Sequence, residues 1–401
     1  MDLTSGYPLW PIQDGLPASY PALDRDIRCD AVVLGGGITG AMVAHELVDA
    51  GFDTVVVDRR EAAWGSTAAS TGLLQYEIDV PLTDLMAMRG REQATRAYLA
   101  CRDAIDKLEH LAHAVEADVG FERKKSLYLA VTPDDRDKLR AECELRRGIG
   151  IRVDYLSESE ISARFSLRRP AALLSYDAAQ VDTYAFAHAL LRAGVRRGLH
   201  VFDRTAVVDI DTSGRNVSLT TANRCVIRAR RLVLATGYET QDFLSEPVAK
   251  LASTYAVASE PLRSSEAWGE DECLIWERAR PYLYLRTTPD HRVVVGGEDE
   301  PFRDPKRRDR LLAAKTKTLV ARTNELLPDI EFEPAFAWTG TFGETEDGLP
   351  YIGAHPEWPN TDVALCYGGN GITYGALAAE IIRDSLCGRR NTDAELFRFD
   401  R

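Results

Sequence analysis

The pattern of apolar and polar residues near the start of the chain predicts a strand–helix–strand unit. Residues 31–34 form a continuous apolar run that ends in glycines, which is typical of a strand buried on both faces. From Ile38 to Ala50 the apolar residues recur at helical spacing, and Gly51 ends the segment. A second buried strand over residues 54–57 completes the unit, whose length suits a right-handed crossover between parallel strands.

The rest of the chain mixes helical and strand patterns. Residues 90–150 are charged and helix-prone around a strand-like stretch at 126–131, and residues 183–198 predict an amphipathic helix. Alternation predicts further strands, in a meander over 201–211, 217–221 and 225–228, a buried strand over 231–237 and an antiparallel sheet within 251–300.

The two ends of the chain differ in character. Residues 5–28 are rich in Pro and Tyr, which indicates an irregular arm laid over the surface. The C-terminal part returns to a strand at 363–366, a glycine-rich turn at 368–371 and a helix over 372–386. We therefore expect an α/β protein (α+β overall) in which a strand-rich insertion splits the half with the glycine turns.

Composition narrows the possible partners. The chain has 401 residues, with 49 basic and 62 acidic side chains and a net charge of −13, so it lacks the basic balance of a nucleic-acid-binding protein. Its seven cysteines are scattered without a CxxC pair, which argues against a disulfide framework or a metal site. We see neither a signal peptide nor an apolar run of the roughly 18 residues that a membrane span needs, and we expect a soluble, cytoplasmic protein.

A glycine-rich turn joins the first predicted strand to its helix. Gly35 permits the tight turn, Gly37 lets the backbone approach a pyrophosphate, and Gly40 allows the helix to pack closely on the strand. Asp58 follows the second strand, where its carboxylate can bind a ribose hydroxyl and disfavours the 2′-phosphate of NADP. Glycines at this spacing also occur in ordinary turns, but the flanking strand, helix and acid predict a bound dinucleotide.

Residues 64–72 form a second small-residue segment, rich in Ser, Thr, Ala and Gly. Such a segment suits the close approach of phosphates and of a flat ring, and it equally suits a flexible polar loop. The residues by themselves leave the choice between FAD and NAD open.

Four blocks together have a familiar arrangement: residues 33–40 with Asp58, residues 65–72, residues 232–237, and residues 338–353 leading into 368–373. They resemble the D-amino-acid oxidase-like family of FAD oxidoreductases, which includes glycine and sarcosine oxidases. The similarity spans residues 29–400, and the Pro- and Tyr-rich start is most similar to the γ-glutamylputrescine oxidoreductase branch.

The resemblance implies a Rossmann-like FAD domain with a parallel sheet and a substrate domain with an antiparallel sheet. The expected boundaries are an arm at 1–28, an FAD domain at 29–84, 171–247 and 337–401, and a substrate domain at 85–170 and 248–336. Some sarcosine-type relatives tether FAD through a cysteine just before the last block. Residues 337–339 contain none, so we expect non-covalent FAD.

The same resemblance implies which residues contact FAD. Val207 should meet the adenine through its backbone, and the loop 368–373 should face the pyrimidine edge of the flavin. The helix that follows would then stabilise negative charge there. The expected FAD contacts are Gly35, Gly37, Ile38, Thr39, Gly40, Asp58, Arg59, Ser66, Thr67, Ser70, Thr71, Gly72, Leu73, Val207, Ala235, Thr236, Gly237, Gly340, Asp347, Gly369, Asn370, Gly371, Ile372 and Thr373.

Candidate substrate residues lie on a strand over 280–286. Period-two alternation puts Tyr282, Tyr284 and Arg286 on one face, and relatives line their substrate pocket with a tyrosine of this strand. The alternative is a half-exposed strand with a polar outer face.

One departure from the family bears on the substrate. Amino-acid-oxidising relatives carry an arginine for the substrate carboxylate at the position of Phe342, so a simple amino acid is in doubt unless Arg286 replaces that arginine. Glu298 falls near a substrate-facing position, and Glu344 is close to Phe342 in sequence, which favours a cationic amine. A solvated turn at 298–300 is the alternative. Glu77 and Asp79 fit the site entrance or the surface equally, and His188 we interpret as structural.

The resemblance implies that a small amine or amino acid loses a hydride from the carbon beside its nitrogen to the flavin, with O2 or another electron acceptor regenerating the cofactor. Sarcosine-type oxidases carry a lysine over the flavin for oxygen reduction, and the matching stretch at 292–295 has none, which leans toward a dehydrogenase. Two alternatives remain: a 2-hydroxy acid dehydrogenase of the same fold, and a non-catalytic FAD-binding subunit of a larger complex.

Overall fold

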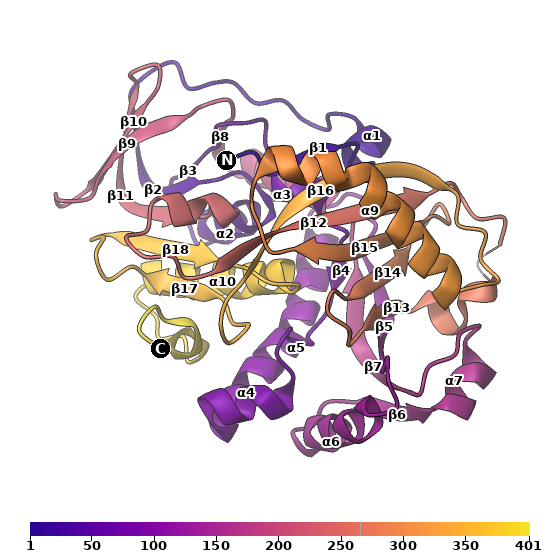
Figure 1. Cartoon of the computed structure of the whole chain (residues 1–401). Helices are drawn as coiled ribbons and strands as arrows, with labels where there is room; N and C mark the ends of the chain where they lie inside the picture. The colour runs from indigo at the N-terminus through magenta and orange to yellow at the C-terminus, as the bar shows by residue number, and fades with distance from the viewer. Residues whose placement is uncertain (265) are drawn as a thin grey trace.

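Two sheets lie side by side and helices cover their outer faces, in a computed structural model that describes residues 1–264 and 266–401 (Figure 1). The chain is mixed α/β, as the hydrophobic pattern predicts, with one mostly parallel and one mostly antiparallel sheet. Among the described residues, no helix combines the length and apolarity that crossing a membrane would take.

The mostly parallel sheet is built around the predicted strand–helix–strand unit. Parallel pairing joins β18, β11, β2, β3 and β8, and antiparallel β17, β10 and β9 extend the sheet. In sheet order the strands are β17 (Tyr351–Ala354), β18 (Thr361–Leu365), β11 (Val226–Leu234), β2 (Ile27–Leu34), β3 (Thr54–Val57) and β8 (His200–Phe202), with β10 (Val217–Thr221) and β9 (Val207–Asp211) branching from β11.

Alternation along β2 explains why this sheet is covered on both faces. Ala31 and Val33 pack into the core under the helices, whereas Val32 and Leu34 pack into a second core under the β9–β10 meander. Each of these four side chains is nearly or fully buried, so a strand apolar at every position is the expected pattern.

The second sheet is antiparallel except for the parallel pair β13 and β5, as far as the described residues show. In sheet order its strands are β1 (Thr4–Gly6), β16 (Pro334–Glu344), β12 (Lys250–Ser259), β15 (Val293–Glu300), β14 (Leu283–Thr287), β13 (Leu274–Glu277), β5 (Glu122–Leu129), β7 (Ala171–Gln180) and β4 (Leu73–Leu74), with β6 (Val153–Ser157) beside β7.

The helices divide between the two sheets. α2 packs against α8 and α10 beside the parallel sheet, and α9 packs on β12, β15 and β16 of the other sheet (Figure 1). The helices are α1 (Leu9–Asp14), α2 (Ile38–Asp49), α3 (Ser66–Ala69), α4 (Leu82–Arg89), α5 (Arg91–Ala114), α6 (Asp135–Gly148), α7 (Glu158–Arg164), α8 (Thr183–Arg196), α9 (Pro305–Leu326) and α10 (Gly371–Leu386), with short 3₁₀ helices at η1 (Gly237–Asp242), η2 (Glu266–Trp268), η3 (Glu270–Glu272) and η4 (Asp393–Phe397).

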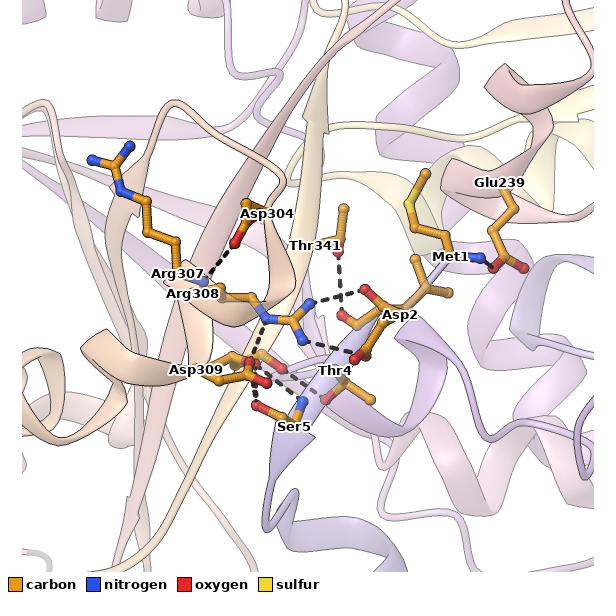
Figure 2. Close-up of polar contacts among 12 residues, drawn as sticks. Met1, Asp2, Thr4, Ser5, Glu239, Asp304, Arg307, Arg308, Asp309 and Thr341 are labelled. Atoms are coloured by element: carbon orange, nitrogen blue, oxygen red, sulfur yellow. Dashed lines mark hydrogen bonds and ion pairs between the residues drawn. The ribbon is translucent and has the colours of Figure 1, made fainter.

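The expectation of an irregular N-terminal arm is wrong for its first half. Strand β1 pairs with β16, and α1 buries Leu9 and Trp10 in the main core, because apolar residues stand between the prolines of this segment. Figure 2 shows the polar contacts of the first residues, where the Arg308 guanidinium donates to Asp2 and the Ser5 hydroxyl donates to Asp309. The N-terminal segment is thus part of the antiparallel sheet.

Two predicted strand boundaries also change. Residues 201–211 do not form one strand, because Arg204 has a φ of +46° and turns the chain between β8 and β9. Conversely, the segments 225–228 and 231–237 join into the single strand β11, which ends at Leu234. The two strands of the first strand–helix–strand unit and the helix over 183–198 lie where the pattern predicts them.

The sheets group some segments differently from the expected domain boundaries. Strands β4, β7 and most of β16 fall in segments expected in the FAD domain, yet they are hydrogen-bonded into the antiparallel sheet.

Candidate active site

A cavity of about 350 Å³ lies where the two sheets meet. Its walls come from the carboxyl ends of β2, β3 and β11, from the N-termini of α2 and α10, from residues 65–79, and from β14 and β16. The carboxyl edge of a parallel sheet is the usual position of a ligand in open α/β folds.

The glycine turn forms one end of the cavity. Gly35 has a φ of +114°, and a Cβ there would lie 2.3 Å from the carbonyl oxygen of Ala235. A Cβ on Gly40 would lie 1.9 Å from the Gly35 oxygen, so only glycine lets α2 pack this closely on the strand end. Gly37 is the N-cap of α2 and offers no capping side chain, and the first N–H of the helix, that of Ile38, donates to the Thr67 hydroxyl at 3.0 Å. This helix end lines the cavity.

Asp58 lines the cavity beside this turn with both oxygens fixed by the backbone. Its carboxylate accepts hydrogen bonds from the Gly36 N–H at 2.7 Å and the Arg60 N–H at 2.8 Å. Burial raises the pKa of Asp58, and the two N–H donors oppose that shift. The side chain is therefore held in a fixed position on the cavity wall beside the glycine turn.

Arg59 and Arg60 also line this end, but their charges are already paired. Both donate to Glu239, which also accepts from the amino group of Met1 (Figure 2). Burial acts to raise the pKa of Glu239, but the hydrogen bond from Arg60 helps to hold that pKa below its ordinary value. The two guanidinium groups therefore do not form a free anion site for a 2′-phosphate.

The short helix α3 and the following Ser70 are anchored from behind. Their carbonyl oxygens accept hydrogen bonds from buried side chains of three distant elements: Thr183 to Thr67, Trp338 to Ala69 and Trp10 to Ser70. The Ser66 hydroxyl lines the cavity, is buried and has no hydrogen-bond partner. An unsatisfied donor at this place indicates a polar ligand such as a phosphate or a ring carbonyl.

The N-terminus of α10 forms the opposite wall. Asn370 makes no capping side-chain bond to this helix and donates instead to the Gln75 carbonyl at 2.9 Å. The Gly369 N–H donates to Asp79 at 2.7 Å. The turn before α10 is therefore tied to the segment 75–79, and both face the cavity.

Most of the residues expected to contact FAD line this cavity, and four do not. Gly40 and Gly72 lie behind the wall, where a Cβ would meet the backbone of Gly35 or Val181. Asp347 is paired with Arg401, and the Thr373 hydroxyl donates to the Gln75 carbonyl. These four residues support the wall rather than form its surface.

The other end of the cavity is aromatic. Tyr282, Tyr284 and Phe342 line it as expected, with Trp276 and Tyr238 in addition. The alternation in β14 is as predicted, because Leu283 and Leu285 are buried in the core under α9. The rings of Tyr282 and Tyr284 lie 5.8 Å apart, and Trp276 stacks on Tyr128 at 3.9 Å.

Arg286 and Glu298 are outside the lining of this cavity. The Arg286 guanidinium is buried and donates to the carbonyls of Gly72 and Val181, each at 2.9 Å. Glu298 has a φ of +58° and its carboxylate pairs with Arg322 at 2.6 Å and with Lys315. Arg286 thus does not replace the missing arginine at Phe342, because its donors are used to hold the Gly72 loop.

Glu77 and Asp79, which the sequence left undecided, both border the cavity, but the Glu77 side chain is 0% exposed and its carboxylate lies 3.8 Å from Arg146. The alternation of Gln75, Glu77 and Asp79 was the signal that could have placed them, since Tyr76 and Ile78 between them are buried in the core. His188 is buried on α8 against the Tyr184 ring, and burial lowers its pKa to about 4. It does not line the cavity.

A family model described as DAO, FAD dependent oxidoreductase, matches residues 30–385. The chain therefore belongs to the DAO family of FAD-dependent oxidoreductases. A glycine oxidase of Geobacillus kaustophilus is 27% identical over 93% of this chain and 96% of that protein. The gamma-glutamylputrescine oxidoreductase of Escherichia coli is 24% identical over 95% of this chain and 88% of that protein.

Solved structures agree on the fold of this family member. The crystal structure of glycine oxidase from Geobacillus kaustophilus superposes with a TM-score of 0.77 at 23% identity, over 91% of this chain and 96% of that chain. The cavity fits the family's cofactor, because a glycine turn, an anchored acid, an unpartnered hydroxyl and the N-termini of two helices all line it.

Proposed function

We propose that this chain is an FAD-dependent oxidoreductase that oxidises a C–N bond of a small amine. One observation carries the proposal: the wall suited to FAD continues directly into an aromatic wall that includes the acid Asp79. Arg59 and Arg60, the arginines of the lining, both pair with Glu239, so among the described residues the lining holds no unpaired guanidinium for a substrate carboxylate. The names of the two relatives, an amino acid oxidase and an oxidoreductase of an amine, support the same class.

The residues of the chain supply binding and orientation. Gly37, Ser66 and the N-terminus of α2 would hold the pyrophosphate, and Asp58 the ribose. When bound, FAD supplies the acceptor for the hydride that leaves the carbon beside the amine nitrogen. As that C–H bond breaks, the nitrogen lone pair forms a C=N bond, so the amine must be neutral when it reacts.

The aromatic residues act at the substrate. Tyr282, Tyr284 and Phe342 would fix the alkyl part of the substrate and exclude water from the reacting carbon. Burial raises the pKa of Tyr282 well above its ordinary value, so this hydroxyl stays protonated and can donate a hydrogen bond but not act as a base at neutral pH. The open N-terminus of α10 would stabilise negative charge at the cofactor.

We propose that FAD is bound without a covalent link. Cys366 lines the cavity, but burial raises the pKa of its thiol, and a protonated thiol is a poor nucleophile. The acceptor for the electrons is O2 or another oxidant. Among the described residues no lysine lines the cavity, which favours a dehydrogenase.

The test is a spectroscopic screen of the purified protein. We expect a yellow protein that releases intact FAD on acid precipitation. When amines, amino acids and 2-hydroxy acids are each added under anaerobic conditions, only the amines should bleach the flavin. A colourless protein that cannot be reconstituted with FAD, or bleaching by hydroxy acids alone, would refute the proposal.

A further inference from the structure

Gln75 lies at the junction of the two walls of the cavity. It follows β4 and lines the cavity, and its main-chain carbonyl accepts hydrogen bonds from the Asn370 amide at 2.9 Å and the Thr373 hydroxyl at 3.0 Å, both at the start of α10. Its side chain shares a hydroxyl partner with Trp276 of the aromatic wall. Gln75 therefore joins the helix end proposed to face the cofactor to the side chains proposed to hold the substrate.

The shared hydroxyl belongs to Ser126 of β5, which is fully buried. Its oxygen accepts hydrogen bonds from the Nε1 atom of Trp276 and from the Nε2 atom of Gln75, each at 3.0 Å. A serine oxygen has two lone pairs, and an indole nitrogen can only donate, so the two donors use both lone pairs. The carboxamide of Gln75 is therefore held by its nitrogen against a buried partner.

The proton of the Ser126 hydroxyl supports the same orientation of the carboxamide. Burial raises the pKa of the Glu77 carboxyl, and Arg146 and then the hydroxyls of two serines, one of them Ser126, oppose that shift. A hydroxyl lowers the pKa of an acid when its proton is directed at the carboxylate. Ser126 then has no proton for a carboxamide oxygen, so Gln75 presents its N–H group to the hydroxyl.

The Oε1 atom of Gln75 is left to bind a ligand. Within the part of the chain that the structure describes, no donor bonds to this oxygen, and unlike the carboxylate oxygens of Glu77 it is not sealed from solvent. The Gln75 side chain is half-buried and belongs to the lining of the cavity. An acceptor that is fixed through its own nitrogen is preorganised for a ligand that brings an N–H or O–H group.

An uncharged acceptor suits the reaction of an amine. The nitrogen must be neutral when the hydride leaves, and a carboxylate beside it would stabilise the ammonium form, whereas a carboxamide oxygen accepts an N–H group of the neutral amine. We propose that Oε1 of Gln75 accepts a hydrogen bond from the reacting nitrogen and aligns its lone pair with the C–H bond that breaks, and that Ser126 is the positioning residue that fixes the carboxamide. This assignment rests on the proposed function, since it names how the amine is held in that site.

The experiment follows reduction of the FAD-loaded enzyme by n-alkylamines of three to six carbons, their N-methyl derivatives and benzylamine. Anaerobic rapid mixing gives the dissociation constant of the amine and the limiting rate of flavin reduction separately, and the amine with the highest limiting rate in the wild-type enzyme is the probe. Gln75→Met keeps a side chain of similar length without a strong acceptor. Its limiting rate should fall about 30-fold, while the dissociation constant of the probe changes less than about threefold.

Gln75→Glu places a carboxylate at the same position and tests the argument from charge. In the wild-type enzyme the limiting rate should rise with pH as the bound ammonium group loses its proton. The carboxylate should stabilise the ammonium form and raise the apparent pKa of that rise by about one unit or more, so the rate lost at neutral pH should return at high pH. Gln93→Glu on the exposed face of α5 is the matched control and should keep the wild-type pH profile.

Two serines on neighbouring strands separate positioning from stability. Ser126 of β5 and Ser175 of β7 form a cross-strand pair and are both fully buried. The Ser175 hydroxyl bonds to that of Tyr76 instead of the Gln75 carboxamide. Ser126→Ala should lower the limiting rate about fivefold, whereas Ser175→Ala should leave it unchanged. Both variants and Gln75→Met should keep the FAD dissociation constant within about twofold, because the main-chain carbonyl that holds the start of α10 is unaltered.

The outcomes separate the two proposals. If amines reduce the flavin but Gln75→Met keeps the wild-type limiting rate, or Gln75→Glu keeps the wild-type pH profile, Gln75 does not hold the reacting nitrogen and the proposed function stands. A slower Gln75→Met that also binds FAD more weakly, or melts at a lower temperature, would make Gln75 a support for α10 only. Equal losses in Ser126→Ala and Ser175→Ala would overturn the positioning role of Ser126. If no amine reduces the flavin, the proposed function itself fails.

Discussion

The two ends of the cavity are built by different means. The end at Gly35 and Asp58 consists of backbone turns, helix N-termini and one acid fixed by backbone N–H groups. The end at Asp79 and Tyr284 consists of side chains from β13, β14, β16 and the segment after β4. A backbone-built wall recognises a ligand common to many relatives, whereas a side-chain-built wall can change its ligand by single substitutions without altering the fold.

The largest expected effect comes from a substitution that disrupts the backbone-built end. In Gly40→Val the new side chain would start 1.9 Å from the Gly35 carbonyl oxygen and push α2 off the strand end. We expect the dissociation constant of FAD to rise at least about 100-fold, or about 2.7 kcal/mol, by equilibrium titration. Gly148→Val is the matched control, since a Cβ on Gly148 has nothing within 4 Å. Wild-type affinity in Gly40→Val would show that the turn does not hold the cofactor.

Sequence reasoning reached the backbone-built end because its signals are local. The glycine spacing, the strand before it and Asp58 after it all lie within one strand–helix–strand unit, and the structure has that unit where the pattern predicts it. The parallel sheet around it follows from runs that are apolar at every position, such as residues 31–34 of β2 and 55–57 of β3.

The side-chain-built end was predicted less well because its residues come together only in the folded chain. Alternation correctly set the faces of Tyr282 and Tyr284, but it could not show that Arg286, on the same face, reaches Gly72 and Val181 instead of the cavity. Glu298 was expected near the substrate from its position in sequence, yet Arg322 on α9 pairs with it outside the cavity lining. Such partners are distant in sequence and leave no local pattern.

A substitution in the side-chain-built end should change the substrate preference, with a smaller expected effect. Phe342→Arg would place a guanidinium among the aromatic residues that line the cavity, where it can pair with a substrate carboxylate and repel an ammonium group. We expect the dissociation constant of amines to rise about tenfold and that of amino acids to fall, measured by anaerobic flavin reduction. Phe342→Met should leave the preference for amines in place. Equal losses for both substrate classes in Phe342→Arg would mean that this position fills space only.

The N-terminal segment borders the cavity at Leu3 and offers the smallest expected effect. Leu3 lines the cavity beside Gly65, and the strand is held by pairing with β16 and by the buried Arg308, which donates to the Asp2 carbonyl at 3.0 Å. Arg308→Met removes this anchor but leaves the cofactor wall intact. The rate of FAD release should therefore increase about fivefold, or about 1 kcal/mol, as followed by flavin fluorescence on dilution. Arg307→Met on the exposed side of α9 is the neighbouring control (Figure 2). An unchanged release rate in Arg308→Met, at unchanged free energy of unfolding, would show that the strand completes the sheet without retaining the cofactor.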